Sequence, residues 1–385
     1  MKRVDDVIVI GGGIVGASAA YRLARSGARV TLVDRADTGQ ATAAGAGIIS
    51  PGTSYHPPTA FFPLAFRAVA YYDTLLAALE EDGETETGFD AVGLLHVATT
   101  EAEAAALPVL LRLIEERRMA GAPRIGAVQM LSGDEARALF PALGACLGAI
   151  HTSAAARVDG RLLRDAMRRA AARRGARIVT GSAEAIREAV GGVELTVNGE
   201  TLTAIAAILA SGAWSGMLAE TLGVRLPVFP QRGQILHLRL PGRETARWPI
   251  VVGFHSHYIL TFPQDRVVAG ATRESDAGFD ARMTAGGVHE ALEEALRVAP
   301  GLGDATLDEV RVGLRPASPD GLPLLGRIPG RERLYIATGH GASGLQLGPY
   351  SGALVADLAL GHLGQSSVPD LDLAPFALDR FAPRA

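Results

Sequence analysis

Residues 4–10 read VDDVIVI, and residues 11–16, which follow at once, read GGGIVG. The β-branched residues of the first stretch predict a buried strand, and the alanine-rich residues after Gly16 predict a helix. A glycine turn between a strand and a helix leaves bare backbone facing a ligand and directs free N–H groups of the helix towards it. Gly11 and Gly13 therefore predict a pyrophosphate site, and Gly16 lets the helix pack closely on the sheet.

A second strand is predicted over residues 28–33, and it ends at Asp34, 18 residues after Gly16. At about this spacing a carboxylate accepts hydrogen bonds from the hydroxyl groups of a nucleotide ribose. Strand, glycine turn, helix, strand and acid together predict a dinucleotide-binding unit of the Rossmann type. They do not distinguish NAD from FAD.

The composition is typical of a soluble globular protein. The 385 residues are 48% hydrophobic and 20% charged with a net charge of -4, which disfavours a nucleic-acid partner. This length favours two domains. The apolar stretch 204–219 contains Ser211, Gly212 and Ser215 and falls short of a membrane span. A lone cysteine, Cys146, excludes an intrachain disulfide, and we expect a cytoplasmic protein.

Further elements follow from periodicity and from helix and turn signals. Asp159 is expected to cap a helix over residues 161–174, and we expect a second helix over residues 345–360. Strands are expected at 176–180, 194–197, 201–210, 234–240, 250–262 and 267–271. The last three predict a sheet that forms one wall of a cavity.

Seven segments of this chain, in order, resemble the glycine oxidase and D-amino-acid oxidase family of FAD-dependent oxidoreductases. They are the glycine turn, the small-residue loop 42–48, ASGAWS at 210–215, PQRGQ at 230–234, GLRP at 313–316, SPDG at 318–321 and GHG at 339–341. The resemblance implies an α/β (α+β) fold, with a Rossmann-like FAD-binding domain interleaved with an antiparallel-sheet substrate domain. The expected FAD-binding domain comprises residues 1–85, 150–222 and 305–385, and the substrate domain comprises 86–149 and 223–304.

The resemblance also implies noncovalent FAD, because Cys146 lies far from the segment where some relatives attach a flavin. No second glycine fingerprint is present, so we expect the organic substrate itself to reduce the flavin. The helix that follows Gly344 is expected to point its positive end at the flavin. The expected FAD contacts are Gly11, Gly13, Ile14, Val15, Gly16, Asp34, Arg35, Thr42, Ala43, Ala44, Gly45, Gly47, Ile48, Ala183, Ser211, Gly212, Trp214, Arg315, Gly339, His340, Gly341, Ser343, Gly344, Leu345 and Gln346.

Three residues are expected at the substrate. By resemblance, Arg315 binds a substrate carboxylate, for which a planar guanidinium is suited, and Tyr258 faces the substrate from the sheet. The second arginine that glycine oxidases carry is replaced here by Ala342, and we hypothesise that Arg273 substitutes for it from another direction. A solvated Arg273 and a sheet-packing Tyr258 are the alternatives.

Three histidines lie near these segments. His255 and His257 would share a face if residues 250–262 formed one strand, as metal ligands could. No third ligand at suitable spacing is evident, so we expect no metal site and interpret these residues and His56 as pocket or surface histidines.

The expected reaction is oxidation of a small amine or amino acid: hydride passes from the carbon bearing nitrogen to flavin N5, and the imine hydrolyses to an oxo acid or aldehyde plus ammonia or an amine. Oxygen or another acceptor would then reoxidise the flavin, so oxidase and dehydrogenase both stay open. A 2-hydroxy-acid dehydrogenase, which would need a base, and an FAD enzyme that modifies tRNA are the alternatives. The oligomeric state, including a homo-oligomer, stays open.

Overall fold

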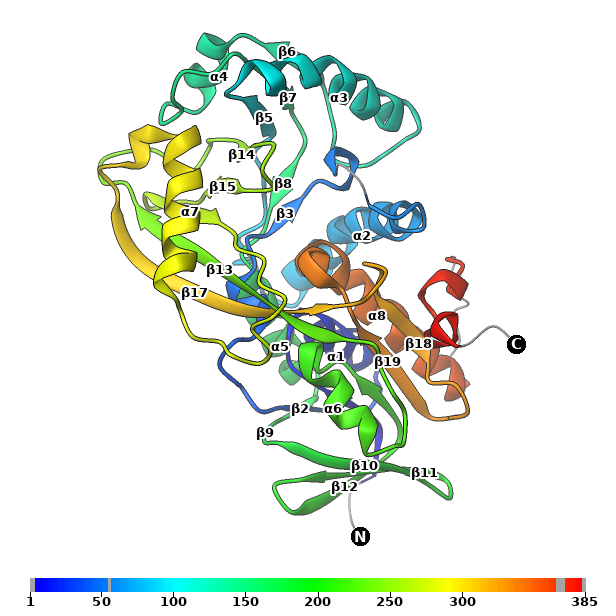
Figure 1. Ribbon diagram of the computed structural model, residues 1–385. Helices are drawn as coiled ribbons and strands as arrows, with labels where there is room; N and C mark the ends of the chain where they lie inside the picture. Colours follow the sequence, from blue (N-terminus) through cyan, green and yellow to red (C-terminus); the bar gives the residue numbers. More distant parts are fainter. Residues whose placement is uncertain (1–3, 55–56, 365–370, 383–385) are drawn as a thin grey trace.

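The computed structural model describes residues 4–54, 57–364 and 371–382. Within these ranges the chain forms two eight-stranded sheets and one three-stranded sheet. Figure 1 shows the first large sheet in the lower half of the molecule and the second in the upper half, with the long strands β13 and β17 running from one half towards the other. None of the helices in the described part of the chain is long and apolar enough to cross a membrane.

The first sheet contains the predicted nucleotide-binding unit. Its strands are β10 (Ala183–Ala189), β11 (Gly192–Val197), β12 (Glu200–Leu209), β1 (Val4–Ile10), β2 (Val30–Asp34) and β9 (Arg177–Thr180), in this order, with β19 (Leu334–Thr338) beside β12 and β18 (Leu324–Arg327) beside β19. Strand β1 runs parallel to both β12 and β2. The predicted strand before the glycine turn, the helix after the turn and the strand that ends at Asp34 are confirmed.

Helices cover this sheet on one face. Helix α1 (Ile14–Arg25) packs against α8 (Gly344–His362) and α5 (Gly160–Arg173), and α2 (Phe61–Glu81) packs against α8. Val7 and Val9 of β1 belong to the core under these helices, whereas Ile8 and Ile10 belong to the core on the other face, which includes α6 (Ser215–Glu220). Burial on both faces explains why β1 reads as a continuous apolar run.

Asp159 caps helix α5, as predicted. Its Oδ1 accepts hydrogen bonds from the backbone N–H groups of Arg161 and Leu162, at 3.0 and 3.2 Å. An aspartate at this position satisfies donors that the first turn of a helix cannot satisfy itself. The cap also fixes where the chain turns between β8 (Ala156–Arg157) and the helix.

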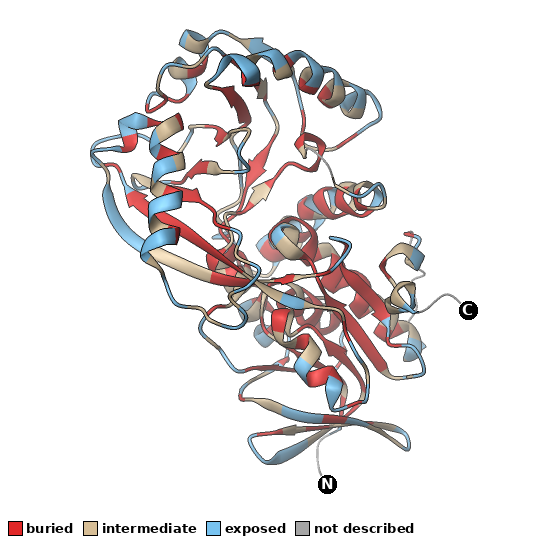
Figure 2. Cartoon of the chain, in the orientation of Figure 1, coloured by how far each residue is buried: buried red, intermediate tan, exposed pale blue. Residues whose placement is uncertain are grey.

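The second sheet has the order β17 (Thr306–Ala317), β13 (Phe229–Arg239), β16 (Arg266–Gly270), β15 (Tyr258–Thr261), β14 (Ile250–Val252), β5 (Leu94–Ala98), β7 (Gly148–Thr152) and β6 (Val128–Leu131). Its neighbouring strands are antiparallel except for β14 and β5. Helix α7 (Ala285–Val298) packs on β13 and β16, and α3 (Glu101–Met119) and α4 (Gly133–Leu139) lie over the far end. Figure 2 shows buried residues in the strands and exposed residues on these outer helices.

The prediction of one strand over residues 250–262 is wrong. The structure has two antiparallel strands here, β14 and β15, paired through Val251 with Ile259 and Val252 with Tyr258. The chain reverses over residues 253–257, where Gly253 breaks the apolar run and Ser256 has a φ of 64°. Alternation of residue types does not report such a reversal, because both arms keep the period of a strand.

The third sheet has three short strands in the order β3 (Ile48–Ile49), β8 (Ala156–Arg157) and β4 (Asp90–Ala91). Strand β17 pairs with β13 along its whole length and so belongs to the second sheet, although residues 305–385 were expected in the nucleotide-binding domain. The domain boundaries stay a prediction.

Candidate functional site

A cavity of about 390 Å³ lies where β1, β2 and β12 end and the second sheet begins. Ligands bind at this edge in sheets of this kind, because the turns that follow parallel strands diverge there. Tyr258 and Arg273 line the cavity together with most of the predicted cofactor residues. These are Gly11, Gly13, Ile14, Val15, Asp34, Arg35, Thr42, Ala44, Gly45, Gly47, Ile48, Ala183, Ser211, Gly212, Trp214, Arg315, His340, Gly341, Gly344, Leu345 and Gln346.

Four predicted cofactor residues do not line this cavity. A Cβ atom at Gly16 would stand 1.8 Å from the carbonyl oxygen of Gly11, so Gly16 serves the close packing of α1. Ala43 faces a second, smaller cavity. Gly339, with a φ of 77°, and Ser343 form the turn that leads into α8.

The N-terminus of α1 opens on the cavity. Gly13 is its N-cap residue, and neither a side-chain cap nor an acidic residue is present in the first turn. The Ile14 N–H donates to Thr42 Oγ1 at 2.9 Å, which ties the turn to the 3-10 helix Ala41–Ala44. Bare backbone at the positive end of a helix favours an anionic ligand such as a phosphate.

Asp34 at the end of β2 is buried, with 6% exposure. Its Oδ1 accepts hydrogen bonds from the Ala36 N–H at 2.7 Å and from Gln40 Nε2 at 3.1 Å. Its Oδ2 accepts none from the described residues, and Arg168 Nη1 lies 3.8 Å away. A buried carboxylate oxygen without a donor fits a ligand hydroxyl group.

The turn after β19 contributes His340, which is 4% exposed. Burial lowers the pKa of His340 to about 4, so its ring is neutral at physiological pH. Its Nε2 has no hydrogen-bond partner among the described residues. Nearby, Gln346 Oε1 accepts the Ser50 N–H at 3.1 Å and holds the start of α8 against the loop after β3.

Arg315 enters the cavity from β17, where it pairs with Gln231 of β13. Its Nη1 donates to the Thr272 carbonyl oxygen at 2.9 Å and, more weakly, to the Arg232 carbonyl oxygen at 3.5 Å. Burial lowers the pKa of Arg315, although arginine keeps its proton in any case. Among the described residues no carboxylate forms an ion pair with it, so a charged guanidinium is available to an anionic ligand.

Tyr258 begins β15 and its hydroxyl group interacts with Arg315. Burial raises the pKa of Tyr258, and the positive charges of Arg315 and Arg273 oppose this rise. The hydroxyl group therefore keeps its proton at neutral pH. It can donate a hydrogen bond to a ligand that Arg315 binds.

Arg273 is exposed and lies on the loop after β16. Its Nη1 donates to the Ser256 carbonyl oxygen at 3.1 Å. No ion pair joins Arg273 to a carboxylate in the part of the chain that the structure describes, and its charge lowers the pKa of Arg315. The cavity thus holds two guanidinium groups of like charge, and Ala342 also lines it.

The histidines do not form a metal site in the described residues. His255 and His257 lie in the reversal between β14 and β15 rather than on one strand. His255 contacts Glu294 at 3.1 Å and Glu103 at 3.6 Å, whereas His257 contacts Glu290 at 3.4 Å. His56 lies outside the described residues.

Gly233 and Gln40 are among the lining residues that sequence reasoning missed. Gly233 was part of the PQRGQ segment, but only the paired strands show that it faces Arg315. Gln40 bonds Asp34 from the small-residue loop. The available signal in the sequence was the side-chain amide of Gln40, six positions after Asp34, which can donate a hydrogen bond to that carboxylate.

The chain is similar to known proteins over nearly its whole length. A family model described as FAD dependent oxidoreductase (DAO) matches residues 6–358. Over 375 residues the chain is 43% identical to the uncharacterized oxidoreductase YurR of Bacillus subtilis (strain 168), covering 96% of this chain and 97% of that protein. It is 33% identical over 384 residues to glycine oxidase of Geobacillus kaustophilus (strain HTA426), covering 99% and 98%.

Among solved structures, iminodiacetate oxidase (IdaA) from Chelativorans sp. BNC1 superposes with a TM-score of 0.91 at 43% identity, covering 97% of this chain and 98% of that chain. Glycine oxidase from Geobacillus kaustophilus superposes with a TM-score of 0.86 at 32% identity, covering 99% and 100%. The predicted fold class and the predicted resemblance are both confirmed.

Proposed function

Because this chain belongs to the family of FAD-dependent oxidoreductases, we propose that it oxidises a small amino acid or related amine at the carbon that bears nitrogen. The observation that carries the proposal is Arg315, a guanidinium group in the cavity that donates to two backbone carbonyl oxygens and forms no ion pair with a carboxylate among the described residues. An unpaired charge of this kind matches a substrate carboxylate. Glycine oxidase and iminodiacetate oxidase among the similar proteins support the same reaction class.

The residues present fit FAD. The bare glycine turn at the start of α1 would hold the pyrophosphate, and the unbonded Oδ2 of Asp34 would accept a ribose hydroxyl group. The loop around Thr42 and the turn at Gly341 would lie along the rest of the molecule. When bound, FAD supplies the electron acceptor for the hydride that leaves the substrate.

The side chains have the task of orienting the substrate. Arg315 would bind the carboxylate through two N–H groups, and the Tyr258 hydroxyl group would donate a further hydrogen bond. Residues of the second sheet line the cavity on this side, where they would shield the bond that is broken from water. The proton of a charged amine must leave before hydride transfer. His340 lines the same cavity, but burial disfavours its protonated form, so the substrate must bind as the neutral amine.

Arg273 narrows the proposed substrate to amines with two acidic groups. Two guanidinium groups without carboxylate partners in one cavity repel each other, and a ligand with two carboxylates would neutralise both. The iminodiacetate named for the similar oxidase is such a molecule. We propose iminodiacetate or a related N-carboxymethyl amino acid as the substrate, with Arg315 and Arg273 each binding one carboxylate.

The test is an anaerobic titration of the purified holoenzyme with iminodiacetate, glycine, sarcosine and 2-hydroxy acids, followed through the loss of flavin absorbance. Reduction by iminodiacetate at low concentration supports the proposal, whereas reduction by 2-hydroxy acids alone contradicts it. Replacing Arg273 by Leu should lower kcat/KM for iminodiacetate at least about ten-fold and leave glycine little changed, because only one substrate has a second carboxylate. Arg239→Leu, an exposed arginine on β13 that pairs with Asp308, is the matched control.

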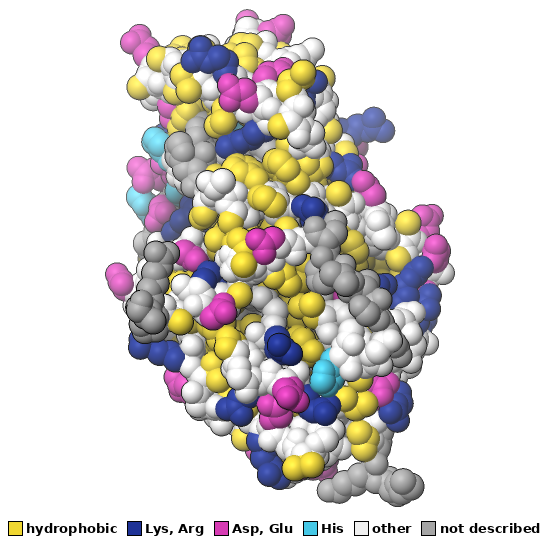
Figure 3. All heavy atoms as spheres, turned by 90° about the vertical axis from the view of Figure 1, so that its right-hand side faces the viewer, with side chains coloured by type: hydrophobic (Ala, Val, Ile, Leu, Met, Phe, Trp, Pro, Cys, Tyr) yellow, Lys and Arg dark blue, Asp and Glu magenta, His cyan; other side chains and the backbone are white. Residues whose placement is uncertain are grey.

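The distribution of surface charge bears on the alternative of a nucleic-acid partner. On the face in Figure 3 basic and acidic side chains are interspersed among the coloured residues, which gives no support to a nucleic-acid partner. Turnover with oxygen, monitored as hydrogen peroxide, distinguishes an oxidase from a dehydrogenase that needs another acceptor. A cytoplasmic location and noncovalent attachment of FAD stay predictions from the sequence.

A further inference from the structure

Glu274 lies beside the substrate arginines and accepts four side-chain hydrogen bonds. Its Oε2 accepts from Arg232 Nε at 2.9 Å and Nη2 at 2.5 Å, and its Oε1 accepts from Thr272 Oγ1 at 2.7 Å and Gln234 Nε2 at 2.8 Å. Burial alone would raise the pKa of Glu274, but the bonds from Arg232, Gln234 and Thr272 hold it below the usual range. The carboxylate is therefore charged and fully engaged.

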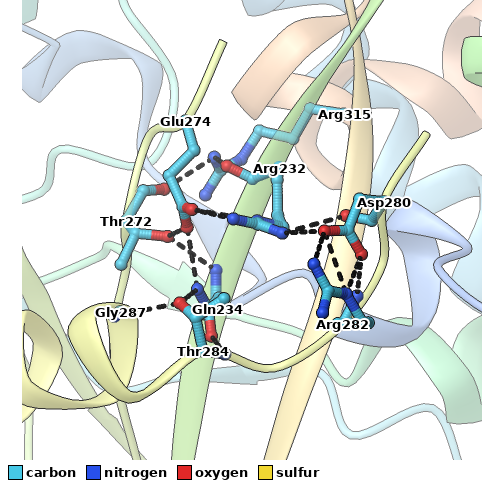
Figure 4. Close-up of polar contacts among 9 residues, drawn as sticks. All are labelled: Arg232, Gln234, Thr272, Glu274, Asp280, Arg282, Thr284, Gly287 and Arg315. Atoms are coloured by element: carbon cyan, nitrogen blue, oxygen red, sulfur yellow. Dashed lines mark hydrogen bonds and ion pairs between the residues drawn. The ribbon is translucent and has the colours of Figure 1, made fainter. Parts of the chain in front are cut away.

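The same residues hold Arg315. Its Nη1 donates to the carbonyl oxygens of Thr272 and Arg232, and both of these residues bind Glu274 through their side chains. Thr272 Oγ1 also accepts the Gln234 N–H at 3.0 Å. The acceptors that orient the Arg315 guanidinium group are thus fixed by one carboxylate, as Figure 4 shows.

The contacts of Glu274 also fix the backbone of Arg273. It stands between Thr272 and Glu274 in the chain, and Glu274 exchanges two backbone hydrogen bonds with Arg232, each of 2.9 Å. The backbone is therefore held on both sides of Arg273. Only the Arg273 side chain, with its contact to the Ser256 carbonyl oxygen, is left to move.

A second attachment holds the far end of this loop. Arg232 Nη1 donates to Asp280 Oδ2 at 3.0 Å, so Arg232 lies between the two acids in Figure 4. Gln234 exchanges two hydrogen bonds with Thr284, of 2.9 and 3.0 Å, where α7 begins. Residues 272–284 are thus anchored at both ends to β13.

We propose that Glu274, acting through Arg232 and Thr272, is the positioning residue that sets the separation of Arg273 and Arg315 and thereby the length of the diacid that the site accepts. The inference rests on the proposed function, in which these two arginines bind the substrate. Its physical basis is that two like charges in one cavity move apart unless the groups that carry them are held in place. Glu274 holds the residues whose carbonyl oxygens accept from Arg315 and the backbone on both sides of Arg273, and both guanidinium groups stay free for the ligand.

The test compares Glu274→Gln with the unaltered holoenzyme. Glutamine keeps the shape of the side chain but loses the charge and presents an N–H₂ group where Arg232 needs an acceptor. The probes are the unreactive acids acetate, oxalate, malonate and succinate, whose Kd values are measured from changes in flavin absorbance. We expect diacid binding to weaken at least about ten-fold, acetate binding to change less, and the preferred diacid to differ in length from that of the unaltered enzyme.

Two further variants make the outcome decisive. Ser275→Ala removes the Gln231 Nε2 to Ser275 Oγ contact of 3.1 Å from the same loop and should leave every Kd unchanged. Arg232→Lys keeps the charge but cannot bind Glu274 and Asp280 together, and it answers the question if Glu274→Gln loses FAD or folds poorly. Diacid affinities and length preference like those of the unaltered enzyme in both variants would overturn the inference.

Arg315→Leu separates this failure from that of the proposed function. If Arg315→Leu abolishes acid binding while the Glu274 and Arg232 variants bind normally, the proposed function stands and the positioning role of Glu274 is rejected. If Arg315→Leu binds the acids as well as the unaltered enzyme, the proposed substrate site itself is rejected. Flavin content and Tm are recorded for every variant, so that a general loss of structure is recognised.

Discussion

The guanidinium group of Arg315 lies against the bare backbone of Gly233, where an added Cβ atom would stand 2.3 Å from Nη2 and 2.4 Å from Cζ. Gly233→Ala should therefore push Arg315 away from the Thr272 carbonyl oxygen. We expect KM for the best amine substrate to rise about ten-fold or more, because a hydrogen bond to a charged group is worth roughly 1.5–3 kcal/mol. Steady-state kinetics on the holoenzyme measure this change.

Gly286→Ala is the matched control for Gly233→Ala. Gly286 lies in α7, is exposed, and has no neighbour within 4 Å of an added Cβ atom. Its KM should equal that of the unaltered enzyme. Equal KM values for all three proteins would show that Arg315 does not depend on the space at Gly233.

Asp34 supports a prediction about cofactor affinity. Asp34→Asn retains an oxygen for the Ala36 N–H but places an N–H₂ group where the unbonded Oδ2 stands. We expect the Kd for FAD to rise about ten-fold, since a charged acceptor would be lost. Fluorescence titration of the apoprotein measures it, and the release of FAD on denaturation tests noncovalent attachment in the same preparation.

Asp6→Asn serves as the control for Asp34→Asn. Asp6 lies on β1 in the same sheet and pairs with Arg29 at 2.7 Å, outside the cavity. Its loss should leave the Kd for FAD unchanged. An unchanged Kd for FAD in Asp34→Asn would show that Asp34 does not bind the cofactor.

The contact of α1 with α8 predicts an effect on stability. A Cβ atom at Gly352 would stand 2.2 Å from the carbonyl oxygen of Val15 and 3.0 Å from the Ala19 nitrogen. Gly352→Ala should lower the free energy of unfolding by about 1–3 kcal/mol, because neither backbone atom can move cheaply. Urea unfolding measures this change. An unchanged urea midpoint would show that α1 and α8 can move apart to admit the added Cβ atom without loss of stability.

The nucleotide-binding unit could be predicted because each of its signals is local. The apolar run before Gly11, the glycines themselves and Asp34 all lie within one strand–helix–strand unit, whose geometry the sequence spacing dictates. The reversal between β14 and β15 could not be read in the same way, since Ser256 adopts its positive φ in a loop whose partners are distant in sequence. The alternating pattern therefore suggested one strand where the structure has two.

The candidate substrate site depends on pairings that no local pattern encodes. Arg315 was expected from the family resemblance, but its acceptors, the carbonyl oxygens of Thr272 and Arg232, follow from the register of β13 with β17 and β16. No sequence pattern indicated a role for Glu274, because a single acidic residue on a loop is common in any sequence. Contacts between distant strands decide which of many arginines and acids meet.

Stability at low pH should depend on His237, a buried residue of β13 with 4% exposure. Burial, and then the positive charges of Arg311 and Arg266, lower the pKa of His237 from 6.5 to about 4. Between these pH values the unfolded chain binds a proton that the folded chain does not, so the free energy of unfolding falls as the pH falls. The shift corresponds to roughly 3 kcal/mol at most.

His237→Leu removes this titration. We expect the free energy of unfolding of the variant to fall less steeply between pH 6.5 and pH 4 than that of the unaltered protein, by about one proton in the slope. Urea unfolding at a series of pH values measures it. His289→Leu is the control, because the His289 side chain is 78% exposed and should follow the unaltered curve. If the His237→Leu curve also ran parallel to the unaltered curve, His237 would be protonated equally in the folded and unfolded chains, and its burial would carry no pH dependence.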